Sequence, residues 1–362
     1  MNHKLTQFAK KLKGGKLDGF IVTNPTNIFY LCGFKSVAPQ EREATLIFSD
    51  SRITLITARL YQNEARNLKS LPAGRQVKIV DQRNKILEQV KKLLKNASRV
   101  GFEEEDLKYS EFIELGKCLT KSDLVPSKNI IEDLRIIKTE EEIKRIEKAQ
   151  VISQKAFEIL VKTIKVGQTE EEIAQKLAKI IKSLGGYGLA FETIVACGLN
   201  SSRPHYVTGN KKVTKGQVLL LDFGAKYQDY CADLSRTIFI GNATDPYKNI
   251  FYHVQKAQSK AVDKIAAGLK MSEVYHTTSR VFKAQKLNKY FIHGLGHGVG
   301  LEIHERPYLR PKVDDILQEN MVFSVEPALY LPWGGVRIED LILVENGRAK
   351  ILGKLTDKII EI

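Results

Sequence analysis

The segment that most constrains the fold of this chain is VLLLDFGAKYQDYCADLSRTIFI, residues 218–240. Its first four residues are apolar and predict a buried strand that runs directly into Asp222, after which Gly224 permits a turn. A return strand is expected to begin near Ala232, which would bring Asp233 alongside Asp222 in a hairpin. For Asp222 alone, a capped turn explains the pattern equally well. Two carboxylates held close together repel each other unless a cation lies between them, so the pair indicates a cation site.

Three of the seven histidines stand within twelve positions in HGLGHGVGLEIHERP, residues 293–307. Glycines separate His293, His297 and His304 and allow the backbone to bend closely around a small object. A single histidine is commonly an ordinary surface or core residue, but that explanation does not suit three in one glycine-rich turn. Imidazole is both a frequent ligand of divalent metals and a general acid or base near neutral pH. We therefore expect some of these histidines to bind metal and others to handle protons.

Two further carboxylates interrupt apolar, strand-like runs. Glu326 lies in FSVEPALY, residues 323–330, and Glu339 lies in GGVRIED, residues 334–340. Each is expected to point inward from a sheet. Together with the two aspartates and one histidine they form an oxygen-rich donor set that suffices for two divalent ions with shared carboxylates. Such a set suits manganese, cobalt, iron or zinc, and affinity alone does not choose among these metals.

The order and spacing of these residues resemble those of the pita-bread metallopeptidases, and within them the aminopeptidase P and prolidase branch. The matching positions are Asp222, Asp233, His297, Glu326 and Glu339, at intervals of 11, 64, 29 and 13 residues. The strings LDFGAKYQDYCADLSRT, GHGVGLEIHERP, EPALY and VRIED are close to the motifs of that branch. The resemblance is specific in the C-terminal part of the chain. The N-terminal part matches only in length, in the alternation of its elements and in the segment NIFYLCGF.

The resemblance implies two divalent metal ions per chain, with manganese expected first and cobalt, zinc or iron as alternatives. Asp222 would chelate one ion, and Asp233 together with Glu339 would bridge both ions. His297 and Glu326 would complete the coordination of the other ion. The implied metal ligands are thus the four carboxylates and the first histidine of the GHGVG string.

The resemblance also implies catalytic side chains around the metals. These are Glu326, His205, His293, His304 and Arg337. His205, in the string SSRPHY, matches the substrate-facing histidine of the branch. His293 and His304 match its two accessory active-site histidines, and Arg337 matches an arginine near the metals.

The chain departs from the branch beside the ligands. Asp229 and Ala328 stand where glycine is usual. We interpret Asp229 as a solvated turn residue and not as a sixth ligand. The segment LPAGRQV, Leu71–Val77, fits no pattern of the branch and is interpreted as an inserted loop.

The implied activity is dinuclear-metal-dependent hydrolysis of the bond between an N-terminal residue and a following proline, by an Xaa-Pro aminopeptidase or an Xaa-Pro dipeptidase. The implied partners are a peptide with proline at its second position and a second copy of the chain, in a homodimer whose N-terminal domain borders the neighbour's active site. A methionine aminopeptidase shares the five ligands but usually lacks such an N-terminal domain. Outside enzymes, the alternative is a metal-free pita-bread module that binds a peptide, a histone or RNA. The intact ligand set weighs against that module and against creatinase, which works without metal.

The length of 362 residues allows two packed cores, and the patterns predict two domains. Residues 1–131 alternate strand-like and helix-like segments, as expected for a smaller creatinase-like α/β domain. Residues 132–362 are expected to form the pita-bread catalytic domain, which makes the whole chain α+β. Pro126 is one of several turn-forming residues that mark the boundary.

The helices at the start of the second domain are indicated by two capping boxes. Thr139 with Glu142 and Thr169 with Glu172 each precede an apolar stripe of helical period. From Phe191 onward the pattern predicts short strands broken by glycine-rich turns.

The composition excludes several other classes. The formal net charge of +15 raises the possibility of nucleic-acid binding. Basic residues nevertheless lie beside glutamates on predicted helices and are not interleaved with aromatic residues, so no dedicated nucleic-acid site is expected. No run of eighteen apolar residues occurs and the first residues are polar, so we expect no membrane segment and a cytoplasmic location. The four cysteines lack C-x-x-C spacing, which suits reduced thiols.

Overall fold

A computed structural model describes residues 3–38, 41–68, 76–80 and 85–362. Of the segment expected to be an inserted loop, Leu71–Val77, positions 71–75 lie outside these ranges. The chain divides into two compact units, Met1–Leu134 and Arg135–Ile362, and each has its own hydrophobic core. Within the described ranges, none of the helices has both the length and the apolar character needed to cross a bilayer.

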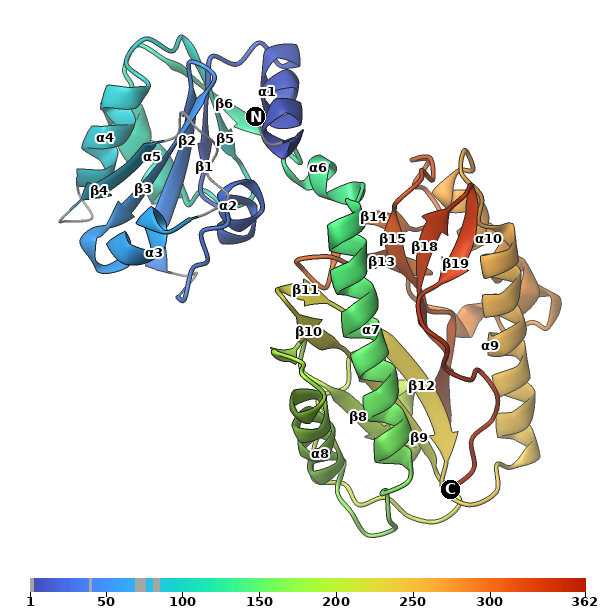
Figure 1. The fold of residues 1–362 in the computed structure, drawn as a ribbon. Coiled ribbons are helices and arrows are strands. Elements are labelled where there is room, and N and C mark those ends of the chain that lie inside the picture. The colour runs from blue at the N-terminus through green and yellow to red at the C-terminus, as the bar shows by residue number, and fades with distance from the viewer. Residues whose placement is uncertain (1–2, 39–40, 69–75, 81–84) are drawn as a thin grey trace. The chain divides into compact units, whose positions relative to one another are not determined.

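The N-terminal unit is an α/β domain built on one mixed sheet (Figure 1). In the described residues this sheet has six strands in the order β4-β3-β2-β1-β5-β6. β1 pairs antiparallel with β2 and parallel with β5. The elements are α1 (His3–Gly14), β1 (Gly19–Val22), α2 (Pro25–Cys32), β2 (Ala44–Ser49), β3 (Arg52–Ala58), η2 (Arg59–Tyr61), α3 (Gln62–Arg66), β4 (Gln76–Val80), α4 (Lys85–Leu93), β5 (Arg99–Glu103), α5 (Tyr109–Cys118) and β6 (Asp123–Ser127). The short helix α6 (Glu132–Ile136) contains the boundary between the two units.

The expected alternation of strands and helices in this unit is confirmed, but the segment around Pro126 is a strand and not an irregular boundary. β6 contains Pro126 and, among the strands described for this unit, pairs only with β5, at the edge of the sheet. Proline has no N–H group to donate, so it is tolerated on an edge strand where one side of the backbone has no partner strand.

The C-terminal unit combines helices with strands that belong to several small sheets. In the described residues these are a five-stranded sheet, β14-β13-β15-β18-β19, two three-stranded sheets, β12-β9-β8 and β11-β10-β7, and the pair β16-β17. The elements are α7 (Glu140–Val161), α8 (Glu170–Ser183), β7 (Gly188–Leu189), β8 (Ile194–Cys197), η3 (Gly198–Ser202), β9 (Val218–Phe223), β10 (Ala225–Tyr227), β11 (Tyr230–Cys231), β12 (Leu234–Phe239), α9 (Asp245–Lys264), α10 (Met271–Ala284), η4 (Asn288–Tyr290), β13 (Gly296–Gly298), β14 (Glu305–Leu309), β15 (Val322–Val325), β16 (Ala328–Leu331), β17 (Gly334–Arg337), β18 (Asp340–Glu345) and β19 (Arg348–Ile351).

Two helix pairs cover the strands of this unit, and each pair has its own core (Figure 1). α7 and α8 pack on β8, β9 and β12 through residues such as Ile152 and Ile173. α9 and α10 pack on the five-stranded sheet through residues such as Val254 and Phe282. Two of the sheets in this unit are therefore each backed by a pair of helices, which agrees with the expected pita-bread architecture.

Both predicted capping boxes are present. The hydroxyl of Thr139 accepts a hydrogen bond from the backbone of Glu142, whose carboxylate accepts one from the Thr139 N–H at 2.8 Å. Thr169 and Glu172 make the same reciprocal pair at the start of α8. The two boxes satisfy backbone donors that would otherwise lack partners at the first turn of each helix.

The expectation of short strands from Phe191 onward is incomplete, because α9 and α10 lie in that region. Ile250, Val254, Ala257 and Ala261 form a buried stripe at helical spacing along α9. That stripe is a signal of an amphipathic helix, and the same period recurs in α10.

Asp222 and Asp233 come from neighbouring strands, as the hairpin prediction requires. β9 pairs antiparallel with β12, and Asp222 lies opposite Ser235 in this ladder. The connection is longer than a turn, since β10 and β11 form a hairpin of their own within another sheet. At the junction, a side chain on Gly224 would overlap the carbonyl oxygen of Ala232. Glycine is therefore needed for the close approach of the two segments that carry the aspartates.

Replacing Gly224 with alanine should destabilise the C-terminal unit by about 1–3 kcal/mol, because the added methyl group forces the two segments apart. Gly188 in β7 is the matched control, since a Cβ there meets nothing within 4 Å. Urea unfolding of Gly224→Ala, Gly188→Ala and wild type measures the difference. Equal unfolding free energies for Gly224→Ala and wild type would contradict the close packing at this junction.

Candidate metal centre

Five side chains meet where strands of the two halves of the C-terminal unit end. Asp222 lies near the end of β9 and Asp233 directly precedes β12. His297 is the central residue of β13. Glu326 follows β15, and Glu339 stands between β17 and β18, where its N–H donates to the carbonyl oxygen of the β12 residue opposite Asp222. The sheets thus bring together residues that are more than a hundred positions apart.

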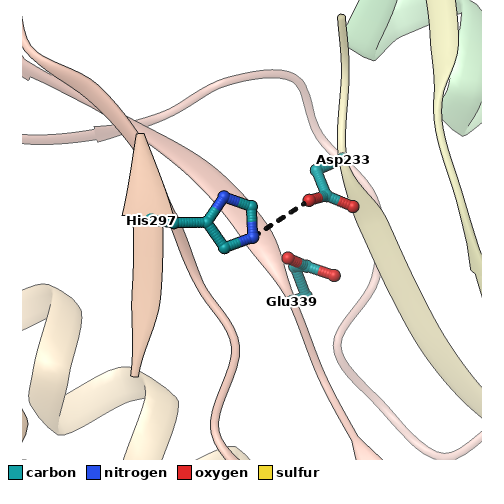
Figure 2. Close-up of side chains that lie close together, drawn as sticks. All are labelled: Asp233, His297 and Glu339. Carbon is teal, nitrogen blue, oxygen red and sulfur yellow. Dashed lines mark ion pairs between the residues drawn. The ribbon is translucent and has the colours of Figure 1, made fainter. Parts of the chain in front are cut away.

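The imidazole of His297 points towards the carboxylates of Asp233 and Glu339 (Figure 2). Its Nε2 atom lies 3.5 Å from Oδ2 of Asp233 and 3.4 Å from Oε1 of Glu326. One ligand atom each of Asp233, His297 and Glu339 lie within 4.8 Å of one another. Nδ1 of His297 lies 3.2 Å from the carbonyl oxygen of Gly298, which can only accept, so Nδ1 carries the proton. The lone pair of Nε2 therefore faces the carboxylates.

Arg337 and Ser235 hold two of the carboxylates in place. The guanidinium of Arg337 forms an ion pair with Oδ2 of Asp222 and donates through Nε to the hydroxyl of Ser235 at 2.7 Å. That hydroxyl donates in turn to Oε2 of Glu339 at 2.7 Å. The other oxygen of Asp222, Oδ1, is buried and has no hydrogen-bond partner. A buried carboxylate oxygen without a partner is the feature that a bound cation would satisfy.

His293 belongs to the same network but is held differently from His297. Nη1 of Arg337 donates to the hydroxyl of Tyr330 at 2.8 Å, and that hydroxyl lies 3.1 Å from Nε2 of His293. Nδ1 of His293 lies 2.6 Å from the carbonyl oxygen of Gly294. Burial, followed by the charge of Arg337, lowers the pKa of His293 to about 4, so the ring is neutral. Both ring nitrogens are engaged, which fixes the orientation of the ring.

A cavity of about 740 Å³ opens beside these groups. Its wall includes every site residue that the sequence indicates: His205, Asp222, Asp233, His293, His297, His304, Glu326, Arg337 and Glu339. Apolar residues line another part of the wall, among them Phe191, Ile194 and Val207. The cavity can therefore hold an organic ligand of peptide size next to the carboxylates.

Burial and mutual repulsion shift the protonation of the clustered groups. Burial, followed by the charge of Glu339, raises the pKa values of Asp233 and Glu326 well above their ordinary range. Burial and carboxylate repulsion raise the pKa of Glu339 to about 8. In the opposite direction, burial followed by the nearby His304 lowers the pKa of His297 to about 3. The carboxyl groups therefore tend to retain protons, which a divalent ion would displace.

The residues present fit a divalent metal ion. The donor set consists of hard carboxylate oxygens and one neutral imidazole, and the lone pair of His297 points at the carboxylates. Oδ1 of Asp222 is buried without a hydrogen-bond partner and can bind a cation. Asp229 lies in the turn between β10 and β11 at φ 72°, a conformation that glycine adopts more readily. Ala328 is buried in β16.

Two contributors to the site were missed in the sequence. Ser235 links Arg337 to Glu339, and Tyr330 links Arg337 to His293. Ser235 stands two positions after Asp233 in the strongest motif, and Tyr330 ends the string EPALY, so both residues lie within motifs that the sequence analysis identified. Their partners are distant in sequence or on another strand, and no local pattern predicts such pairs.

An oxygen-rich cluster with one imidazole, on the wall of a cavity in a helix-backed two-sheet unit, defines a metal-dependent hydrolase. Residues 144–346 match the model of metallopeptidase family M24, and residues 4–137 match that of the creatinase/prolidase N-terminal domain. The chain belongs to metallopeptidase family M24 and is a metallo-exopeptidase.

Similar proteins span nearly the whole chain. An Xaa-Pro dipeptidase of Pyrococcus horikoshii is 33% identical over 362 residues, with 99% of each chain covered. The solved structure of an Xaa-Pro dipeptidase from Bacillus anthracis matches with a TM-score of 0.93 at 32% identity and covers 99% of both chains. That of an X-Pro aminopeptidase from Thermotoga maritima matches with a TM-score of 0.87 at 31% identity, covering 98% of this chain and 100% of the other.

The shifted pKa values predict how pH changes the stability of the metal-free protein. The carboxyl of Glu339 keeps its proton in the folded state up to about pH 8, whereas its ordinary pKa is 4.5. The folded state thus binds more protons in this window, so the free energy of unfolding falls as pH rises. Buried His293 and His297 oppose this trend only below their ordinary pKa of 6.5. We expect a fall of up to about 2 kcal/mol between pH 6.5 and pH 8.

Urea unfolding of chelator-treated protein across this range measures the effect. Glu339→Gln should reduce the fall, because a neutral amide has no proton to lose. Glu345→Gln, at the end of β18 and outside the cavity wall, is the matched control and should keep the wild-type profile. A wild-type profile that rises between pH 6.5 and pH 8 would contradict the assignment.

Proposed function

We propose that this chain hydrolyses the peptide bond between an N-terminal residue and a following proline, with two divalent metal ions held by Asp222, Asp233, His297, Glu326 and Glu339. The observation that supports this most is that four carboxylates and one imidazole, whose lone pair faces the carboxylates, lie together on the wall of a peptide-sized cavity. The names of relatives that cover nearly the whole chain agree with the choice of an Xaa-Pro bond. Manganese is the expected metal, with cobalt, zinc or iron as alternatives.

When bound, two such ions would supply a Lewis acid that polarises the peptide carbonyl and lowers the pKa of water. Asp222 would hold one ion, Asp233 and Glu339 would be shared, and His297 with Glu326 would hold the other. Arg337 and Ser235 keep Asp222 and Glu339 oriented through direct hydrogen bonds. These two residues are therefore expected to limit reorganisation of the ligands when the metals bind.

The residues of the chain would move the proton and stabilise the developing charge. Glu326 lines the cavity and has a raised pKa, so it is suited to accept a proton from water and pass it to the leaving nitrogen. His205 and His304 are exposed residues of the cavity wall that can donate hydrogen bonds to substrate carbonyl oxygens. The apolar part of the wall gives the proline ring a surface that excludes water.

The substrate class is tested by incubating metal-loaded protein with Xaa-Pro, Xaa-Pro-Yaa and Xaa-Ala-Yaa peptides. We expect cleavage of the proline peptides, and the ratio of the first two separates a dipeptidase from an aminopeptidase. Cleavage of Xaa-Ala-Yaa alone would sink the proline assignment. Elemental analysis of the same sample should find about two metals per chain, as expected for two metal ions acting together. No metal after reconstitution, and no cleavage, would instead support a metal-free peptide-binding module.

Glu326→Gln should slow turnover by roughly a hundredfold to ten-thousandfold even at saturating metal, because the amide cannot accept the proton. The amide keeps the shape and one oxygen of the ligand, so metal affinity should fall only modestly and excess metal should restore occupancy. Turnover measured against metal concentration separates the two effects, with Glu345→Gln as the control. Recovery of near wild-type turnover at high metal would mean that Glu326 is only a ligand.

A further inference from the structure

A second group of buried charges includes Glu305, the residue that follows His304 in the chain. Glu305, Arg135 and Lys138 are 6%, 4% and 3% exposed. Nζ of Lys138 donates to Oε1 of Glu305 at 2.7 Å, and Nη2 of Arg135 forms an ion pair with Oε2 of the same carboxylate. We call these three residues the buried ion cluster. None of them lines the cavity.

The cluster ties the first residues of the C-terminal unit to the His304 segment. Nζ of Lys138 also donates to the carbonyl oxygen of Arg135 at 2.7 Å, and Arg135 reaches a second carboxylate, that of Glu302, at 2.7 Å. The backbone N–H of Lys138 donates to the carbonyl oxygen of Asn320 at 2.9 Å. The segment that starts the unit is therefore fixed both to the neighbouring loop and, through charge, to Glu305.

Glu305 is next to both histidines of this segment, since it follows His304 in the chain and pairs with the strand that carries His297. It is the first residue of β14 and pairs with Gly298, next to an irregularity in the ladder between His297 and Gly298. His304 immediately precedes it and lines the cavity. His304 lies in the bend that leads into β14, so a restraint on Glu305 is transmitted to His304 through the single peptide bond that joins them. The ring centroids of His297 and His304 lie only 4.3 Å apart, so a small rotation of the His304 ring would make it clash with the His297 ring.

Stability alone does not account for three buried charges. Because removing ions from water is costly, well-packed apolar residues of similar volume often stabilise a fold as well as a buried ion cluster, or better. What hydrogen-bonded charges add is direction, since each donor must lie on the line of its acceptor. A Cβ on Gly300 would overlap the carboxylate of Glu305, so glycine at this position makes room for that carboxylate.

We propose that Arg135, Lys138 and Glu305 are positioning residues that hold the His304 imidazole in the geometry needed for peptide hydrolysis. This inference rests on the proposed function for its catalytic readout, but the orientation of His304 can be measured without it. Lys138→Met is the informative variant. It removes one charge while keeping the length of the side chain, and Arg135 still compensates Glu305.

We expect Lys138→Met to lower kcat about tenfold to a hundredfold, as for a catalytic group displaced by less than about 1 Å, with metal content and KM little changed. The decisive measurement is a double-mutant cycle with His304→Ala. If Lys138 acts through His304, adding Lys138→Met to the His304→Ala variant should lower kcat by less than about twofold. Arg145→Met, which breaks an exposed i,i+4 pair with Glu141 on α7, is the matched control and should leave kcat unchanged.

An independent readout uses the metal-free protein. The imidazole ¹⁵N signals of His304, assigned by their loss in His304→Ala, should shift in Lys138→Met and stay unchanged in Arg145→Met. If Lys138→Met does not fold, Glu305→Asp, which keeps the charge but shortens its reach, takes its place in the cycle. Unchanged ¹⁵N signals, or kcat losses that multiply in the double variant, would overturn the positioning role. If wild type cleaves no Xaa-Pro peptide while the signals still shift, the proposed function fails and the positioning of His304 stands.

Discussion

Four carboxylates lie close together around one histidine in the C-terminal unit, and the two hydrophobic cores of that unit hold the carboxylates in place. Such groups repel each other in a medium where water cannot screen them, at a cost of several kcal/mol. Arg337 forms an ion pair with Asp222. Its charge also lowers the pKa values of Asp233, Glu326 and Glu339, but burial and mutual repulsion outweigh it, so these carboxyl groups retain protons or need a cation. The free energy that opposes this repulsion comes from packing elsewhere in the unit.

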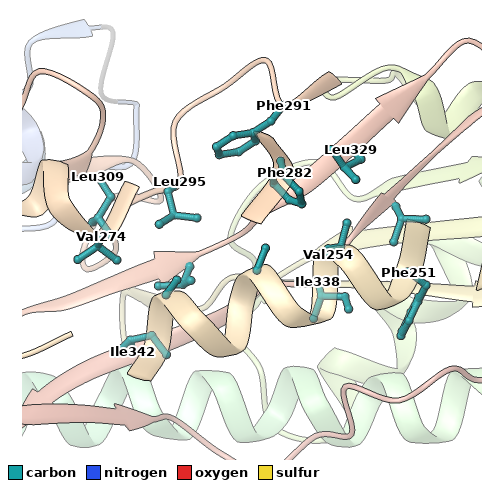
Figure 3. Packing of buried hydrophobic residues seen from close by; sticks show 14 of the residues in the cluster. Phe251, Val254, Val274, Phe282, Phe291, Leu295, Leu309, Leu329, Ile338 and Ile342 are labelled. Atoms are coloured by element: carbon teal, nitrogen blue, oxygen red, sulfur yellow. The ribbon is translucent and has the colours of Figure 1, made fainter. Parts of the chain in front are cut away.

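That packing reaches each ligand through its neighbour in the chain. Leu221 precedes Asp222 and Leu234 follows Asp233, and both are fully buried in the core under α7 and α8. Val325 precedes Glu326 and Ile338 precedes Glu339, and both are fully buried in the core under α9 and α10. Figure 3 shows Ile338 among side chains of this second core, including Phe251 and Val254. The two aspartates are thus anchored by one core and the two glutamates by the other, so the candidate metal centre lies between the two cores.

The sequence predicted those parts of the structure whose cause is local. A buried strand ending at Asp222, capping boxes at Thr139 and Thr169, and a histidine-rich glycine turn each depend on residues within a few positions of one another. It also indicated the donor set, because the residue types themselves state the chemistry. Contacts between distant segments escaped it, as with Ser235 and Glu339, 104 positions apart, since no local period records them. Pro126 misled for a related reason, because whether a strand lies at a sheet edge is a property of the whole sheet.

The segment from His297 to Glu305 lies between two charge networks of different kind. On the cavity side, His297 faces carboxylates that a cation would unite. On the buried side, Glu305 is already neutralised by Lys138 and Arg135, and although burial alone would raise its pKa, these cations bring that pKa below the ordinary value. The carboxylate of Glu305 therefore has its cations without any ligand, whereas the carboxylates of the cavity do not. Because this restraint depends on neither metal nor substrate, it can hold His304 in one orientation before either of them binds.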